Sequence, residues 1–189
     1  MIDRNEFKNI RNEMQASDLK REQVIQLSRE IITLSKQIIY AAQRNELNEA
    51  KSAIKTIQPK VRKLRKIKIA LDTNINSVAF QEYVEALSFY EFVKNKKIPT
   101  RKKLQVSAEN YLSGLCDLTG ELVRKSIYDV IHKKFNEAEE IKDFVHEIYG
   151  EFLKLHLRNG ELRKKSDAIK WNLKKLEEVM YDISMKGRH

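Results

Sequence analysis

Glycine, proline and cysteine are scarce in this sequence of 189 residues, and each shortage excludes a class of structure. Five glycines and two prolines are too few for the many tight turns of a β-sandwich, a barrel or a doubly wound sheet. A single cysteine, Cys116, forms neither an internal disulfide nor a thiolate-rich metal site, and such cysteine usage is typical of the reducing cytoplasm. These shortages favour a chain built from helices.

Long apolar runs are missing as well. No stretch approaches the roughly 18 apolar residues that cross a bilayer, and the charged segment MIDRNEFKNIRNEMQ lacks the apolar core of a signal peptide. Hydrophobic residues make up 41% of the chain and charged residues 34%, a balance that indicates a globular protein rather than a disordered one. We therefore expect a cytoplasmic protein without a membrane partner, folded as one domain over residues 1–189.

Positive charge is abundant and clustered. The formal net charge is +10, yet residues 51–68 and 94–103 hold eight and six basic side chains without any acid, so the rest of the chain has a net charge of −4. Clustered Lys and Arg attract polyanions, because each neutralised phosphate releases condensed counterions. The alternative is that these runs are solvated helix faces. The predicted nucleic-acid-binding residues within the two runs are Lys60, Arg62, Lys63, Lys66, Lys97, Arg101 and Lys102.

Apolar residues recur at helical spacing through most of the chain. The expected helices begin near Val24 and cover residues 46–71, 74–93, 107–132 and 136–157, with a last one after Gly160. Ser107 and Asn136 are predicted N-caps, and Pro59 is expected to kink the second helix or to split it after Ile57. The pattern predicts an all-α fold, an antiparallel bundle of six to seven helices.

Three glycines lie inside expected helices, where each costs about 1 kcal/mol relative to alanine. We expect a neighbouring helix to pack closely against each of them, at Gly114, Gly120 and Gly150. Simple tolerance of the glycines is the alternative, and spacing alone does not decide between the two.

Two expected helices each present a pair of carboxylates on one face. Glu82 and Glu85 are three residues apart, and Asp117 and Glu121 are four apart, so each pair projects to one side of its helix. Carboxylates among apolar neighbours repel one another unless a cation neutralises them, and oxygen ligands suit Mg²⁺ or Mn²⁺. Arg124 follows Asp117 by about two turns and is a candidate phosphate clamp. From spacing alone, surface ion pairs with Lys or Arg are the more common explanation of such acidic pairs.

The sequence resembles the translin superfamily in several long motifs. QEYVEALSFYEFVKNKKIPT and ENYLSGLCDLTGELVRKSI resemble the branch of translin-associated factor X, while LRKKSDAIK and KKLEEVMYDIS are similar to the closing helices of translin. A motif like factor X joined to translin-like C-terminal helices is expected of archaeal single-chain members. The resemblance implies a translin-like helical domain that assembles into a homo-octamer and binds RNA and single-stranded DNA.

The resemblance also implies an activity. In the factor X branch the acidic motif belongs to a Mg²⁺-dependent endoribonuclease site, which maps onto Glu82, Glu85, Asp117 and Glu121 as metal ligands and catalytic residues. The first hypothesis is accordingly an endoribonuclease that cleaves single-stranded RNA with Mg²⁺ or Mn²⁺. The second is a shell that binds RNA or single-stranded DNA without catalysis, and the third is a structural bundle with solubilising basic runs.

Overall fold

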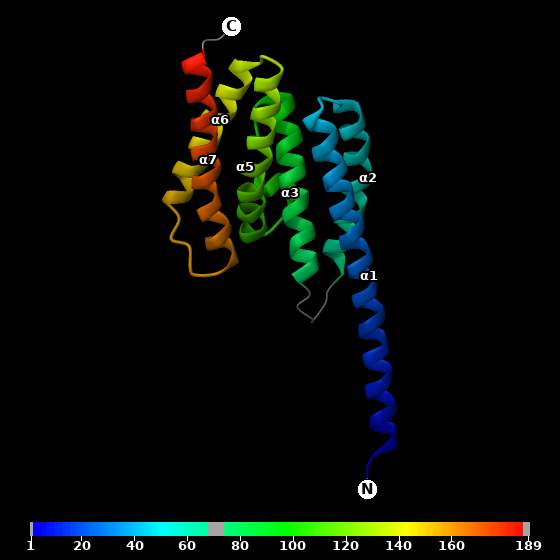
Figure 1. Cartoon of the computed structure of the whole chain (residues 1–189). Helices are drawn as coiled ribbons and strands as arrows, with labels where there is room; N and C mark the ends of the chain where they lie inside the picture. The colour runs from blue at the N-terminus through cyan, green and yellow to red at the C-terminus, as the bar shows by residue number, and fades with distance from the viewer. Residues whose placement is uncertain (1, 68–73, 187–189) are drawn as a thin grey trace.

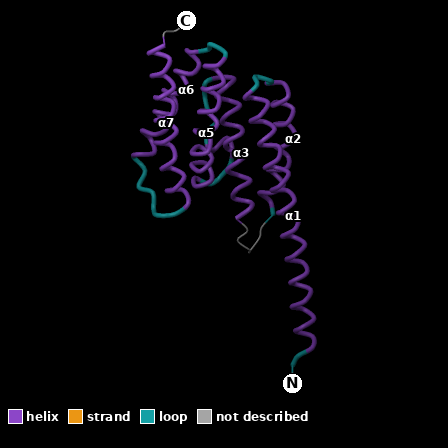
Figure 2. Tube along the Cα trace, viewed as in Figure 1, coloured by secondary structure: helices purple, strands orange, loops and turns teal. Residues whose placement is uncertain are grey.

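Seven helices account for nearly all of the structure, a computed structural model that describes residues 2–67 and 74–186. Helices α1 to α7 cover Arg4–Gln43, Leu47–Lys66, Asn74–Asn95, Arg101–Leu104, Ala108–Ile131, Phe135–Leu153 and Glu161–Lys186. Within the described ranges there is no strand, as Figure 2 also shows. The expected all-α fold is confirmed. No helix in these ranges combines the length and the apolar character needed to cross a bilayer.

Helices α3 and α5 lie at the centre of the bundle. Helix α3 packs against α1, α2 and α5, while α5 packs against α3, α6 and α7. Figure 1 shows the resulting order, with α1 and α2 on one side and α6 and α7 on the other. The N-terminal part of α1 extends well beyond the other helices. Because α3 and α5 are flanked on both sides, side chains at their mutual contact are shielded from solvent by neighbouring helices.

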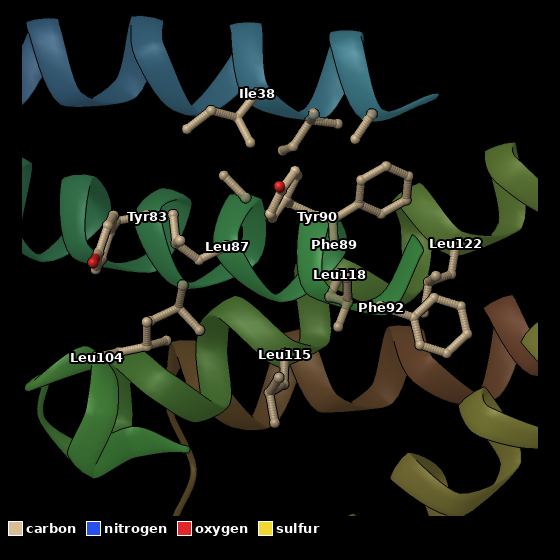
Figure 3. Close-up of a cluster of buried hydrophobic side chains, with 14 of the residues drawn as sticks. Ile38, Tyr83, Leu87, Phe89, Tyr90, Phe92, Leu104, Leu115, Leu118 and Leu122 are labelled. Carbon is tan, nitrogen blue, oxygen red and sulfur yellow. The ribbon is translucent and has the colours of Figure 1, made fainter. Parts of the chain in front are cut away.

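The core forms where apolar stripes of these helices meet. Figure 3 shows side chains of α3 between those of α1 above and those of α4 and α5 below. The labelled residues of this cluster are Ile38, Tyr83, Leu87, Phe89, Tyr90, Phe92, Leu104, Leu115, Leu118 and Leu122. In α7 the helically spaced residues Ile169, Leu173 and Leu176 are buried. Helical spacing thus predicts the inward faces correctly in the central and C-terminal helices.

Helix α5 has the predicted boundaries. The hydroxyl of Ser107 accepts a hydrogen bond from the backbone N–H of Asn110 at 3.1 Å, which satisfies one of the free amides at the helix N-terminus. The helix then runs to Ile131. This cap fixes where α5 begins, and therefore which of its residues face α3.

Helix α2 corrects one of the two alternatives expected at Pro59, the split after Ile57. The helix continues through this residue to Lys66 instead of splitting after Ile57. The carbonyl that loses its partner belongs to Lys55, an exposed residue, while Ile57 stays buried. The last expected residues of this helix, from Lys68 to Leu71, lie outside the described residues.

Helix α6 also departs from the expected boundaries. It begins at Phe135 rather than after Asn136, and it ends at Leu153 rather than Leu157. The start is set by the turn before it, where Lys133 has a φ of 60° and the N–H of Lys134 donates to the last turn of α5 at 2.8 Å. Turn geometry, rather than an asparagine cap, determines this boundary.

Candidate acidic site between three helices

The two predicted carboxylate pairs lie on the neighbouring helices α3 and α5. We call Glu82 and Glu85 of α3, together with Asp117 and Glu121 of α5, the acidic cluster. Gly114 allows this approach: a Cβ atom at that position would lie 2.7 Å from the carbonyl oxygen of Gln81 and 2.7 Å from Cβ of Val84. The α5 backbone therefore touches α3 one turn before Asp117.

Of the three glycines expected at close contacts, Gly114 alone has this role. A Cβ atom at Gly120 would have its nearest neighbour at 3.8 Å, and one at Gly150 would meet nothing within 4 Å. The expectation of close approach is therefore wrong for Gly120 and Gly150. Gly114 is the position at which a missing side chain brings the acidic cluster together.

A cavity of about 620 Å³ opens between α1, α3 and α5, and the acidic cluster lines it with three of its four members. Its lining residues are Thr33, Lys36, Gln37, Ile39, Tyr40, Gln43, Glu82, Glu85, Glu121 and Arg124. Asp117 is not part of this lining. The cavity thus combines carboxylates with two cationic side chains and an aromatic ring.

Glu85 is the most deeply buried member of the acidic cluster, with 8% of its surface exposed. Burial raises the pKa of Glu85 to about 9, and the negative charges of Asp117, Glu82 and Glu121 add to the rise. Burial also raises the pKa of Glu82, against the opposing effect of nearby Lys36. The cluster therefore holds negative charge at a cost in free energy, which a cation would relieve.

Lys165 of α7 supplies one such cation. Its Nζ donates to Oδ2 of Asp117 at 2.5 Å and to Oε1 of Gln81 at 3.0 Å. Cys116, which precedes Asp117, is buried, and burial raises the pKa of its thiol to about 12. Its sulfur stays protonated, and the side chain packs as a small buried group.

Glu121 is held by neighbours on both sides. Nε2 of Gln43 donates to its backbone carbonyl at 3.0 Å and to its Oε2 at 3.1 Å. Nη1 of Arg124 donates to both of its carboxylate oxygens at 3.0 Å, while 66% of the Arg124 side chain is exposed. The predicted phosphate clamp thus lies at the mouth of the cavity, paired with a carboxylate and accessible from solvent.

The oxygen atoms of the acidic cluster suit a hard divalent cation in their chemistry. Their placement is less complete, because within residues 2–67 and 74–186 no three His, Cys, Asp or Glu side chains are arranged to hold a metal ion. The ion pair of Asp117 with Lys165 is one reason, since it engages a carboxylate that a metal would need. Donor type and charge fit Mg²⁺, and ligation requires side-chain movement.

The described residues of the two basic runs lie outside the lining of the cavity, and the first run contacts the residues directly after the second. Arg65, near the end of α2, donates to the carbonyl of Leu104 and to Oε1 of Gln105 at 2.9 Å, which joins α2 to α4. The exposed members predicted to bind nucleic acid are Arg62, Lys63, Lys66, Lys97, Arg101 and Lys102. Lys60 is paired with Glu30 of α1 at 2.5 Å. Among the predicted basic residues that the structure describes, Arg124 lines the cavity and the seven others do not.

Sequence reasoning missed four residues that shape the site. Lys36, Tyr40 and Gln43 come from α1, whose apolar spacing gave no sign that its polar face would cover carboxylates. Lys165 lies in LRKKSDAIK, one of the segments that carried the family resemblance, but nothing there singled it out from its lysine neighbour. These four side chains reach the site through contacts between distant parts of the chain, which local sequence patterns do not show.

Comparison with known proteins identifies relatives over most of the chain. The pattern of the Translin family matches residues 19–187. Translin of Homo sapiens is 39% identical over 90 residues, which are 47% of this chain and 40% of that protein, so the match spans less than half of translin. Translin-associated protein X of Mus musculus is 26% identical over 226 aligned positions, covering 96% of this chain and 78% of that protein. An uncharacterized protein of Methanocaldococcus jannaschii is 32% identical over 171 residues, covering 87% and 76%.

Solved structures show the same arrangement of helices. Apo-NeC3PO superposes with a TM-score of 0.87 at 27% identity, covering 96% of this chain and 97% of that one. AfC3PO in complex with duplex RNA superposes with a TM-score of 0.85 at 21% identity, covering 96% and 97%. The matched family pattern and the shared fold agree with the motifs of the sequence. This chain therefore belongs to the Translin family.

Proposed function

We propose that this chain is a metal-dependent endoribonuclease that binds and cleaves single-stranded RNA as a homo-oligomer. The acidic cluster carries the proposal, because three of its four carboxylates line a cavity that also presents Lys36 and Arg124, while the fourth, Asp117, is paired with Lys165. Burying carboxylates beside one another is costly for stability, and such arrangements concentrate at functional sites. Strong perturbation of the Glu85 pKa is the electrostatic sign of this cost.

The charge distribution supports RNA as the ligand. We call the side chains of the two basic runs the basic surface. Arg65 links the first run to Leu104 and Gln105, directly after the second run, and Lys and Arg neutralise phosphates irrespective of sequence. AfC3PO, which has the same fold, is bound to duplex RNA. Tyr40 lines the cavity with 59% of its surface exposed, and an exposed ring favours unpaired bases, which stack on aromatic side chains. Single-stranded DNA offers the same phosphates and bases, so we include it as a ligand.

The four members of the acidic cluster would hold Mg²⁺ or Mn²⁺. When bound, such an ion lowers the pKa of a coordinated water and offsets charge on the phosphate. Arg124 and Lys36 are placed to bind the non-bridging phosphate oxygens. Glu82, whose pKa is raised by burial, would accept the proton that water loses as its oxygen bonds to phosphorus, through the carboxylate oxygen that the ion leaves free. The bond from phosphorus to the leaving oxygen breaks in the same step, and that oxygen takes a proton from solvent.

Exposed apolar side chains support self-association. Near the N-terminal end of α1, Phe7, Ile10 and Met14 are 49%, 40% and 63% exposed at spacings of three and four. Trp171 and Met185 of α7 are exposed to 65% and 67%. Such stripes on a helix are typical of surfaces that pack against another chain. We propose an octamer, whose mass would be eight times that of the 22.3 kDa chain.

A shell that binds nucleic acid without cleaving it is the second candidate. The Lys165–Asp117 ion pair favours it, because a lysine already compensates part of the charge that a metal would neutralise. The two candidates agree on binding and differ in catalysis. Only a measurement that separates the two steps distinguishes them.

The test uses labelled single-stranded RNA, duplex RNA and single-stranded DNA of the same sequence. Binding is measured by fluorescence anisotropy in EDTA, and cleavage by gel electrophoresis with Mg²⁺, Mn²⁺ or EDTA. Asp117→Asn removes one charge from the acidic cluster, and Asp167→Asn is its control, since Asp167 is 66% exposed on α7. We expect internal cleavage of single-stranded RNA with metal, loss of it in Asp117→Asn, and binding by both variants.

Cleavage that persists in EDTA or in Asp117→Asn refutes the proposed metal site. Binding without cleavage at any Mg²⁺ or Mn²⁺ concentration establishes the non-catalytic shell instead. Equal cleavage of the duplex refutes the single-strand preference alone. Light scattering on the same samples gives the mass of the assembly.

A further inference from the structure

Lys165 binds two other helices from its position near the start of α7. Its Nζ donates to Asp117 on α5 at 2.5 Å and to Gln81 on α3 at 3.0 Å. The side chains of Lys165 and Asp117 are each 33% exposed. Three helices therefore meet at one ammonium group, beside the acidic cluster.

The neighbouring lysine of α7 makes a different kind of contact. Lys164 pairs with Glu161 of its own helix, and the two side chains are 75% and 82% exposed. Exposed pairs of this type contribute little to stability, because water screens them and the side chains lose mobility. The Lys165 pair joins positions 48 residues apart and is less exposed, so water screens it less. Adjacent positions of α7 thus hold a contact between helices, made by Lys165, and an exposed pair within one helix, made by Lys164. A change at Lys164 is therefore a control for the same change at Lys165.

The charge of Lys165 reaches beyond Asp117. It opposes the rise in the pKa of both Glu82 and Glu85, so these carboxylates also experience its positive charge. Lys36 acts on Glu82 from the α1 side of the cavity. Lys165 faces the cluster from the opposite flank, and it is the cation in direct contact with Asp117. In the absence of a metal ion, Lys165 is the group that neutralises this carboxylate.

We propose that Lys165 is the resident counter-ion of the acidic cluster and that a divalent cation competes with it for Asp117. This inference rests on the metal site of the proposed function. A divalent ion ligated by Asp117 would lie within a few ångströms of Nζ of Lys165, and like charges at such distances repel. Lys165 is thus a positioning residue: it holds α7 against α3 and α5 without metal, and it weakens the affinity for the ion.

Three variants test the inference. Lys165→Gln removes the charge but keeps a polar side chain, Lys165→Arg keeps the charge, and Lys164→Gln is the matched control on the same helix. The first measurement is the urea unfolding midpoint in EDTA, and the second is Mn²⁺ affinity by calorimetry with electron paramagnetic resonance. We expect Lys165→Gln to have a lower midpoint than the wild type and to bind Mn²⁺ about tenfold more tightly. Lys165→Arg and Lys164→Gln should resemble the wild type in both.

An unchanged or weaker Mn²⁺ affinity of folded Lys165→Gln overturns the competition. Failure of the wild type and every variant to bind Mn²⁺ refutes the proposed metal site, and with it the competition. The counter-ion role is then decided in EDTA by the double variant Asp117→Asn/Lys165→Gln. If Lys165 acts through Asp117, its replacement lowers the midpoint less when Asp117 is already Asn. An equal loss in both backgrounds overturns that role.

Discussion

Replacement of Glu85 by Gln should make the protein more stable and remove part of its pH dependence. The side chain is 8% exposed, and its pKa is raised to about 9 by burial and by the neighbouring carboxylates. In the unfolded chain the group ionises near its ordinary value of 4.5. The folded state therefore binds more protons between these limits, and the stability that Glu85 contributes is lost as the pH rises from about 4.5 toward 9.

The magnitude follows from the linkage between protonation and unfolding. One unit of pKa corresponds to about 1.4 kcal/mol. Between pH 4.5 and pH 7, Glu85 therefore lowers the free energy of unfolding by about 3 kcal/mol. Gln has the shape of the protonated acid and does not titrate. Glu85→Gln should thus gain less than about 1 kcal/mol over the wild type at pH 5 and about 3 kcal/mol at pH 7.

Urea unfolding monitored by circular dichroism, at one protein concentration in EDTA from pH 5 to 8, measures this difference. Glu177→Gln on the exposed side of α7 is the control, and its curve should run parallel to that of the wild type. A constant offset between Glu85→Gln and the wild type across this range refutes the reasoning. A gain in stability together with a loss of cleavage would be the signature of a carboxylate retained for function.

Two further changes test the packing of the site and its ligand. Gly114→Ala should destabilise the protein by about 1–3 kcal/mol in urea unfolding, because its Cβ would lie 2.7 Å from backbone and side-chain atoms of α3. The Cβ of Gly150→Ala would meet nothing within 4 Å, so this variant should be more stable than the wild type by up to about 1 kcal/mol. Similar effects of the two variants would refute the close contact at Gly114. Tyr40→Ala should weaken binding of single-stranded RNA by about 1–3 kcal/mol in anisotropy titrations, while Tyr40→Phe keeps the ring and the affinity. Equal losses in both Tyr40 variants would point to the hydroxyl rather than to stacking.

The fold was predictable wherever one local signal dominated. Ser107 caps α5 as predicted, because a hydroxyl at that position has a free backbone N–H within reach. At Pro59 the predicted split does not occur, because the continuous helix keeps Ile57 and Val61 buried on either side of the proline. Burial of apolar residues along a whole helix can thus keep the helix continuous through a single proline. The short helix α4 after Pro99 was not predicted, because its four residues have no apolar periodicity.

The site was predictable in its parts and not in its assembly. Helical spacing placed Glu82 with Glu85 and Asp117 with Glu121, and the structure confirms that each pair lies on a helix. Spacing did not show which of three glycines brings the helices together, because that depends on what the partner helix presents. Lys165 lies 48 residues from Asp117 along the chain, and no local pattern encodes their contact.

Helix α3 separates the two charged surfaces of the molecule. Burial raises the pKa of Tyr83, and Arg65 and Arg62 of the basic surface oppose this rise, whereas the preceding residue, Glu82, faces the cavity and Lys36. Consecutive residues of a helix point about 100° apart, so adjacent positions of α3 serve different surfaces. In the proposed function the basic surface acts over roughly the 8–10 Å Debye length, which suffices to attract RNA without holding it at the cavity. Cleavage would require direct contact, which in this proposal Arg124, Lys36 and the acidic cluster would make.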